Sequence, residues 1–409
     1  MNDLCIDNNT LKIISPGERN TDSGPDFINA RIQIGATIWA GNIEIHSNSS
    51  DWYKHGHEKS KSYDNIILHV VYNQDINVLR LNNELMPTLE LKDKIKPEVY
   101  GCYESFLASN SWIPCQNQIK KVRELILKDW MEHLVIERLE KKTLIIKDSL
   151  LLNKHDWQQT FYQHLARNFG FKLNAEPFEL LAKYLPMNFL AKHKDQLIQI
   201  EAMLFGQAGM LESSFLDDYP KKLNEEYKFL KNKFSLNPID GHLWKFLRLR
   251  PYNFPTIRIS QFANLIHKSN GLFSKIIEAK DINELEKLFD VSCSEYWMNH
   301  FQFDKPSKKS EKKIGKQTIH LIIINTIVPF LFLYGQEKNE ERFIDKALQI
   351  LENTNAENNS IIQKWKQTGI EIKSALETQA LIELKNNYCN HKKCLNCRIG
   401  NDLLMRFNS

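Results

Sequence analysis

Residues 24–46 read GPDFINARIQIGATIWAGNIEIH, and this stretch decides the fold of the N-terminal part of the chain. Apolar and polar residues alternate with a period of two in Ala30–Ile34 and again in Thr37–His46, which is the pattern of β-strands. Gly35-Ala36 between them suits a tight turn. The stretch therefore predicts two antiparallel strands joined as a hairpin.

The rest of the chain divides into two regions that differ in hydrophobic periodicity. Ile66–Tyr72 is apolar enough for a central strand, while Val78–Leu81 and Thr88–Leu91 are expected as edge strands. The polar stretch 51–64 is expected to hold a short helix. From about residue 118 onward the apolar residues recur at three- and four-residue steps, which indicates helices. The sequence predicts an α+β protein with an N-terminal core at 1–100, an all-α domain at 118–387 and a cysteine-containing segment at 388–409.

Composition and charge set limits on the class of protein. Hydrophobic residues make up 42% of the 409 residues and charged residues 25%, which is ordinary globular composition. The formal net charge of +4 permits contact with nucleic acid without arguing for it. The first residues lack the pattern of a secretory signal. The most apolar stretch, Ile319–Tyr334, is shorter than a spanning helix needs and contains Pro329, so we expect a buried, kinked helix in a cytoplasmic protein rather than a membrane span.

Two carboxylates on the hairpin are candidate metal ligands. Asp26 stands just before the first strand and Glu44 stands on the second, so the hairpin allows them to approach. Together with the Ile45 carbonyl they would offer the hard oxygen ligands that Mg²⁺ or Mn²⁺ prefers. Such an ion polarises a phosphoryl oxygen and lowers the pKa of a bound water. His46, on the same strand face as Glu44, is expected to orient that water or to contact the phosphate.

The order of these elements resembles the core of the PD-(D/E)XK nuclease superfamily. Pro25-Asp26 and Glu44-Ile45-His46 are similar to the two halves of its motif. The resemblance implies a mixed β-sheet with a flanking helix, Asp26, Glu44 and His46 as catalytic residues, and hydrolysis of phosphodiester bonds. The sequence departs from the motif at His46, where the superfamily usually has a lysine. A histidine is neutral much of the time at pH 7, so the departure bears on turnover more than on metal binding.

A second reading of the same region uses its histidines. His55-Gly56-His57, with His46 or His69, would form a transition-metal site of cupin or hydrolase type. A third reading gives the polar cluster no catalytic role, so that it binds a ligand or only maintains the fold.

Another resemblance covers nearly the whole chain and supplies no activity. The chain is similar to an uncharacterised bacterial family built on a domain of unknown function, in the segments GPDFINARI, WAGNIEIHSNSSDWYKHGH, YDNIILHVVY, LFGQAGML, RLRPYNFPTIRISQFA and CLNCRIG. The resemblance implies additional residues before the Pro16-Gly17 segment in that family, so this chain is expected to begin late and to lack an N-terminal helix.

An arginine-rich segment in the helical part is a candidate contact for nucleic acid. Arg248, Arg250 and Arg258 lie among prolines and aromatic residues, and guanidinium groups suit phosphates. An equally good interpretation is a connection between helices, in which the arginines satisfy carbonyl and carboxylate groups of the protein.

Cysteines near the C-terminus are candidate ligands for a second metal. Cys394 and Cys397 form a C-x-x-C turn, Cys389 adds a third thiol, and His391 or the distant Cys115 would complete four ligands. The group suits Zn²⁺ or an iron–sulfur cluster. Some PD-(D/E)XK nucleases hold such a cluster with one distant cysteine and a C-terminal trio, although the spacing C-x4-C-x2-C differs. Free thiols are the alternative.

The sequence thus favours a metal-dependent nuclease or nuclease-like protein that binds nucleic acid, DNA more readily than RNA. A non-catalytic scaffold for nucleic acid or protein, and a metalloenzyme that uses the histidines on a small molecule, are the alternatives.

Overall fold

The computed structural model describes residues 4–6, 9–269 and 271–406, and the chain divides into two compact units. Unit 1 combines residues 1–123 with residues 392–409, and unit 2 spans Glu124–His391. The expected boundaries, 1–100, 118–387 and 388–409, differ from this division mainly at the C-terminus. Long-range packing of the last residues onto the N-terminal part leaves no local signature in the sequence.

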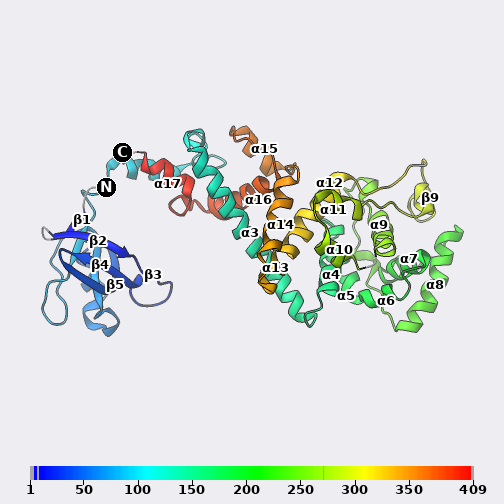
Figure 1. Cartoon of the computed structure of the whole chain (residues 1–409), viewed down its shortest axis with the longest axis horizontal. Helices are drawn as coiled ribbons and strands as arrows, with labels where there is room; N and C mark the ends of the chain where they lie inside the picture. The colour runs from blue at the N-terminus through cyan, green and yellow to red at the C-terminus, as the bar shows by residue number, and fades with distance from the viewer. Residues whose placement is uncertain (1–3, 7–8, 270, 407–409) are drawn as a thin grey trace. The chain divides into compact units, whose positions relative to one another are not determined.

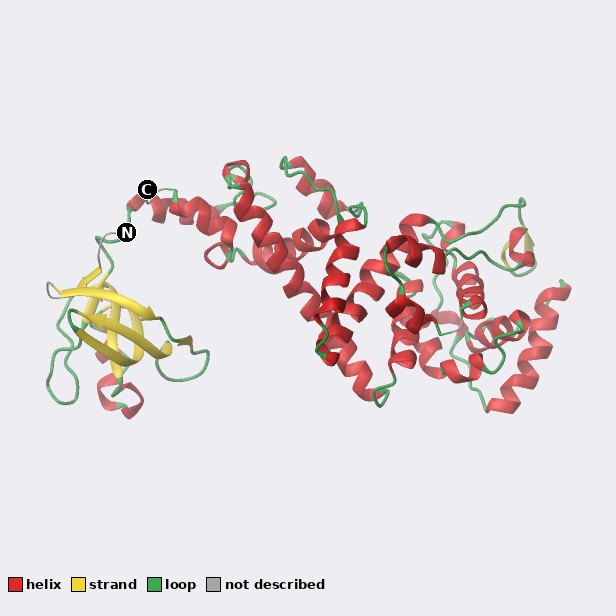
Figure 2. Cartoon of the chain, in the orientation of Figure 1, coloured by secondary structure: helices red, strands yellow, loops and turns green. Residues whose placement is uncertain are grey.

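A seven-stranded mixed sheet forms the centre of unit 1. Its pairing order is β1-β2-β4-β5-β6-β7, with β3 paired to β4. The strands are β1 Leu4–Ile6, β2 Asn9–Ser15, β3 Glu18–Arg19, β4 Phe27–Ile34, β5 Thr37–Asn48, β6 Ile66–Asn73 and β7 Thr88–Glu90. Pairing is antiparallel from β1 to β5 and parallel from β5 to β7. Because β1 also approaches β7, the sheet is nearly barrel-shaped (Figure 2).

The hairpin predicted from residues 24–46 is present as β4 and β5 (Figure 1). Ile34 pairs with Thr37 across the turn, and Gly35 has a φ of 57°, a conformation that glycine adopts without strain. The expected strand Val78–Leu81 is wrong, because only Leu79 forms an isolated bridge, with Leu85. The chain turns back on itself there, since the Arg80 amide donates to the Glu84 carbonyl over 2.8 Å.

A crossover of short helices connects the parallel strands β5 and β6, as a parallel pair requires. It consists of α1 Asp51–Lys54 and the 3₁₀ turns η1 His57–Lys59 and η2 Lys61–Tyr63. The two strands approach closely at Gly41, where a Cβ atom would lie 2.5 Å from both the Asn65 carbonyl oxygen and the Ile67 side chain. Only glycine permits this approach without displacing β6.

Two groups of buried apolar residues hold unit 1 together. The larger one lies between the strands and includes Ile6, Leu11, Ala30, Ile32, Ile43, Ile67, Leu68 and Leu89. The smaller one lies under the crossover and consists of Trp52, Ile66, Val78 and Met86, with Tyr63 against it. Burial of this apolar surface is the main stabilising contribution to the sheet and to the position of the crossover.

Unit 1 also contains helices, which come from the segments before and after unit 2 in the sequence. They are α2 Pro97–Ala108, the 3₁₀ turns η3 Ile119–Lys121 and η10 Cys394–Asn396, and α17 Arg398–Met405. The Arg123 side chain binds Asp402 of α17 through Nε at 2.7 Å and Nη2 at 2.6 Å from Oδ1. This ion pair joins segments that are 279 residues apart in the sequence.

Unit 2 is helical in its described residues apart from the two-stranded ribbon β8 His300–Gln302 and β9 Lys305–Pro306. Its α-helices are α3 Glu124–Leu152, α4 Trp157–Phe169, α5 Ala175–Tyr184, α6 Met187–Ala191, α7 Leu197–Gln207, α8 Asp218–Phe234, α9 Pro255–Lys268, α10 Leu272–Glu278, α11 Ile282–Leu288, α12 Lys316–Ile322, α13 Val328–Lys338, α14 Glu341–Asn353, α15 Ser360–Gln367 and α16 Ala375–Glu383. The mixed α+β class expected from the sequence is confirmed.

The apolar stretch around 319–334 lies within one long helical run, Lys316–Lys338, whose most apolar window is 78% buried inside the protein. A π-helical turn, Ile323–Ile327, joins α12 to α13, and Pro329 sits in the first turn of α13. In the described residues this is the one helix long and apolar enough to cross a membrane. Its burial is that of a core helix, as the sequence predicted.

Candidate metal centre

The end of β5 carries polar side chains on its buried face. Glu44 is only 5% exposed and His46 only 9%, whereas Ile45 between them is 44% exposed. The two polar residues share a face, as the alternation predicts, and that face is buried although Ile43 on the opposite face is buried in the core too. Burying polar groups is unfavourable unless they find partners, so a buried polar face of this kind indicates a site.

Three further histidines meet His46 from neighbouring segments. Its Nδ1 atom lies 2.8 Å from Nε2 of His69, which is fully buried on β6. Its Nε2 atom lies 3.1 Å from Nδ1 of His55 in the crossover. His57 stacks on His46 with 5.2 Å between ring centroids. One ligand atom from each of His46, His55 and His57 lies within 4.8 Å of the others, which is a spacing that a single metal ion can bridge.

Glu44 adds a carboxylate to this cluster. Its Oε1 atom lies 3.2 Å from Nε2 of His57 and 3.5 Å from Nε2 of His46. Its Oε2 atom accepts the Asp26 amide over 3.1 Å, while Asp26 Oδ2 accepts the Ile45 amide over 2.9 Å. Asp26 and Glu44 therefore lie side by side at the start of β4 and the end of β5, with Glu44 facing the histidines.

Burial controls the protonation of the cluster. Desolvation, reinforced by the charge of Asp26, raises the pKa of the Glu44 carboxyl to about 7. Desolvation, together with the neighbouring His57 and His55, lowers the pKa of His46 to about 4, and burial lowers that of His69 to about 4 as well. His46 and His69 are therefore neutral at pH 7, and a neutral imidazole has the lone pair that a metal requires.

The crossover is held in the conformation that presents His55 and His57. Gly56 between them has a φ of 71°, and the Asp51 carboxylate at the start of α1 accepts the Asn48 amide over 3.0 Å. Tyr63 stacks on His57 at 3.8 Å between centroids, and Trp52 meets the same ring edge-on at 5.4 Å. The positions of His55 and His57 follow from this packing, and His-Gly-His is the one local signal that points to them.

The arginines predicted to contact nucleic acid all lie in unit 2. Arg248 and Arg250 are exposed, whereas Arg258 on α9 is only 5% exposed. The Arg258 guanidinium donates to Asn253 Oδ1 over 2.6 Å and to Gln261 Oε1 over 2.9 Å. Its burial favours the alternative in which this arginine stabilises the connection between helices.

Three of the cysteines predicted as metal ligands, Cys115, Cys394 and Cys397, belong to unit 1, and Cys389 belongs to unit 2. Burial, together with the nearby Cys397 and Cys394, raises the pKa of Cys115 to about 12. Burial and Cys397 likewise raise the pKa of Cys394 to about 11. The thiols of Cys115, Cys394 and Cys397 are thus close enough to repel when ionised, and a bound cation would remove that repulsion.

Comparison with known proteins identifies a family. The model of the family described as "Protein of unknown function (DUF2851)" matches residues 2–360, so the chain belongs to this family. No curated protein and no solved structure matches the chain. The resemblance to a domain of unknown function is therefore confirmed, and the C-terminal segment CLNCRIG lies beyond the matched residues. The family description assigns no activity, and the nuclease resemblance stays a prediction.

Proposed function

We propose that unit 1 is a metal-dependent phosphodiester hydrolase whose ion is held by Glu44, His46, His55 and His57. The observation that carries the proposal is the convergence of three imidazoles and one carboxylate, drawn from β5 and the crossover, around a common point. Without a cation the buried Glu44 is costly to ionise, and the imidazole lone pairs face one another.

Of the ions expected from the sequence, the donor set favours those that bind imidazole over Mg²⁺. Carboxylate and water ligands suit Mg²⁺ and Mn²⁺, whereas imidazoles suit Zn²⁺ or Fe²⁺. With three histidines and one glutamate, we propose Zn²⁺ or Mn²⁺ in place of Mg²⁺. An ion in this position would polarise a phosphoryl oxygen and lower the pKa of a bound water.

Two residues around the ligands have positioning roles in this proposal. In the tautomer that a metal would require, His69 Nε2 accepts the Nδ1 proton of His46, and the Nε2 lone pair of His46 is directed toward Glu44, His55 and His57. Partners of this kind fix the tautomer of a metal-bound histidine. Asp26 is oriented by the Ile45 amide beside Glu44, where it can accept a proton from the attacking water.

Phosphodiester hydrolysis is favoured over other metal-assisted reactions by the resemblance to PD-(D/E)XK nucleases. Three features are in accord with that resemblance: an antiparallel β4–β5 hairpin, a helical crossover to the parallel strand β6, and Asp26 just before β4 beside Glu44 on β5. His46 takes the place of the usual lysine. In this proposal it is a metal ligand, so its neutral state is an advantage.

Cleavage of a labelled DNA oligonucleotide with Zn²⁺ or Mn²⁺ added tests the proposal. We expect cleavage by the natural protein and its loss in His46→Ala and His55→Ala, while His242→Ala, at an exposed histidine of unit 2, retains it. Cleavage that survives both cluster substitutions contradicts the assignment. Turnover of a small diester without oligonucleotide cleavage favours the small-molecule metalloenzyme instead.

The cysteines form a separate proposal. We propose that Cys115, Cys394 and Cys397 contribute to a structural metal site, with Zn²⁺ or an iron–sulfur cluster as the occupant. Arg123 and Asp402 bring the two cysteine-bearing segments together independently of any metal. The site would then stabilise the return of the C-terminus to unit 1.

A further inference from the structure

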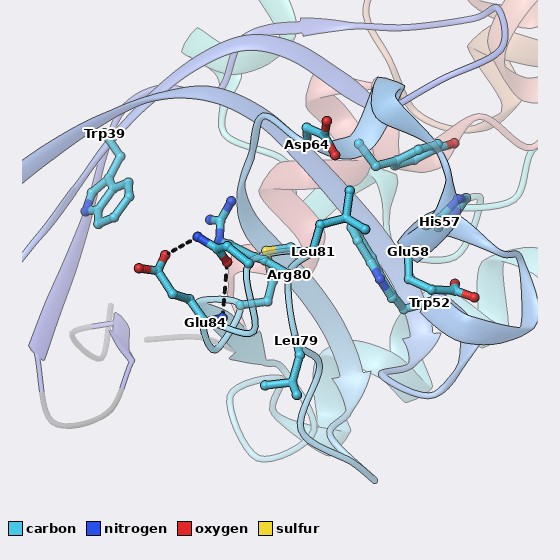
Figure 3. Close-up of a pocket in the computed structure, with 12 residues that line it drawn as sticks. Trp39, Trp52, His57, Glu58, Asp64, Leu79, Arg80, Leu81 and Glu84 are labelled. Carbon is cyan, nitrogen blue, oxygen red and sulfur yellow. Dashed lines mark hydrogen bonds between the residues drawn. The ribbon is translucent and has the colours of Figure 1, made fainter.

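A cavity of about 310 Å³ lies beside the candidate metal centre and shares His57 with it (Figure 3). Its walls come from β5, from the crossover and from the turn at 78–86. The lining residues are Trp39, Trp52, His57, Glu58, Tyr63, Asp64, Leu79, Arg80, Leu81, Asn82, Glu84 and Met86. The volume is at the lower end of the range for small-ligand sites and is too small for a base pair with its backbone.

Arg80 is the cationic group of this cavity (Figure 3). Its Nη2 atom is buried and has no hydrogen-bond partner, and the charge of Glu84 acts on the guanidinium. Burial also lowers the pKa of Arg80. A buried guanidinium nitrogen without a partner is costly, and the planar group is shaped to bind a phosphate. The Arg80 side chain is therefore arranged to bind an anion.

Hydrogen bonds fix the conformation of the turn around Arg80, and they therefore fix where its guanidinium lies in the cavity. The Met86 amide donates to the Val78 carbonyl over 2.9 Å, and the Leu79 amide donates to the Tyr53 hydroxyl over 3.1 Å. Tyr53 belongs to α1, so the turn and the histidine-bearing crossover are linked directly. The position of Arg80 relative to the metal centre is therefore fixed.

The remaining walls suit a nucleobase. Trp39 is 38% exposed and lines the cavity, as does Trp52 (Figure 3). The rings of Trp52 and Tyr63 both contact His57. Bases stack on aromatic side chains of this kind. Glu58, Asp64 and Glu84 supply acceptors for the edge of a base, and their negative charges oppose a polyanion that runs along the rim. A single nucleotide would bring one phosphate to Arg80 and one base to the aromatic walls.

We infer that the cavity receives one unpaired nucleotide adjoining the scissile phosphate, so that the substrate is a single-stranded nucleic acid, and that Arg80 binds a phosphate of that nucleotide. The inference rests on the proposed phosphodiester hydrolysis at the neighbouring centre. It narrows the substrate to strands whose bases are not paired.

Binding rather than cleavage tests the inference, so that its failure is distinguishable from a lack of hydrolysis. The probe is a short fluorescein-labelled DNA strand, alone and annealed to its complement, with full-length metal-free protein in chelator. We expect the natural protein to bind the single strand more tightly than the duplex. Arg80→Gln removes a charge-assisted hydrogen bond and is expected to weaken single-strand binding by about tenfold or more.

Two further variants keep the test decisive. Trp39→Ala, at a partly exposed position, is expected to weaken binding by about fivefold or more, whether or not Arg80→Gln folds. Arg19→Gln on β3, an exposed arginine that does not line the cavity, is the matched control and is expected to bind as the natural protein does. Equal affinity for duplex and single strand, or unchanged binding in both cavity variants, overturns the inference. Oligonucleotide binding without any cleavage overturns the proposed hydrolysis alone.

Discussion

Glu44 makes the affinity of the centre for metal depend on pH in a way that one substitution should remove. Its pKa is raised to about 7, so an incoming ion must displace a proton from Glu44 below that pH. At about pH 6 roughly one tenth of Glu44 is ionised, and at about pH 8 roughly nine tenths. We therefore expect Zn²⁺ to bind about tenfold more weakly at pH 6 than at pH 8, a difference of about 1.4 kcal/mol.

Two of the histidine ligands, His46 and His57, contribute little to the pH dependence in this interval. His46, with a pKa of about 4, is neutral throughout it, and the pKa of His57 is also lowered by burial. In Glu44→Gln the amide keeps the shape of the side chain but cannot ionise. This variant should bind Zn²⁺ more weakly at every pH, with the Glu44 component of the pH dependence gone.

Competition with a chromogenic chelator, corrected for the chelator's own protonation, measures these affinities. Glu18→Gln on β3 is an exposed matched control and should retain the tenfold pH dependence. An unchanged pH dependence in Glu44→Gln, or none in the natural protein, would refute the assignment of Glu44 as a ligand.

Three other outcomes follow from the structure. Gly41→Ala should lower the free energy of unfolding by about 1–3 kcal/mol in denaturant titrations, because the new Cβ meets β6 at 2.5 Å, and an unchanged midpoint would contradict the close approach. Cys394→Ser should lose zinc or iron in elemental analysis while the exposed Cys5→Ser keeps it; equal metal in both would exclude the thiol site. The metal-free protein should melt at lower temperature as pH falls from about 6.5 to 4, because His46 and His69 take up protons less readily in the folded protein than in the unfolded chain. The raised pKa of Glu44 has the opposite effect on the melting temperature between about pH 7 and 4.5. The net effect is a decrease, because two histidines outweigh one carboxyl group. A melting temperature that rises on acidification would contradict the burial of these histidines.

The hairpin and its carboxylates were predictable because their signals are local. Alternation, the Gly35 turn and the Asp26 and Glu44 positions all lie within 23 consecutive residues. The same alternation could not show that Glu44 and His46 face inward, because period two assigns residues to faces without saying which face is buried. His55 and His57 were visible only as one of several interpretations, since short 3₁₀ turns give little periodic pattern.

Other features depended on contacts that sequence spacing does not encode. The return of α17 to unit 1 rests on partners such as Arg123 and Asp402, which are 279 residues apart. The segment around Arg258 has the composition of a phosphate-binding segment, but Arg258 itself is buried and bonded within the protein. Only the packing of α9 distinguishes a phosphate contact from a structural arginine. No local pattern in the sequence predicts the cavity at Arg80, because the start of the turn at 78–86 has the composition of an edge strand.

The metal content of the protein tests the central claim most directly. Protein purified without oxygen and without added chelator should contain about one zinc or manganese per chain that is lost in a His46→Ala, His55→Ala double variant, while any metal at the cysteines remains. The double variant should stay folded by circular dichroism. Identical zinc, manganese and iron contents in the two proteins would contradict the account that Glu44, His46, His55 and His57 form a metal centre.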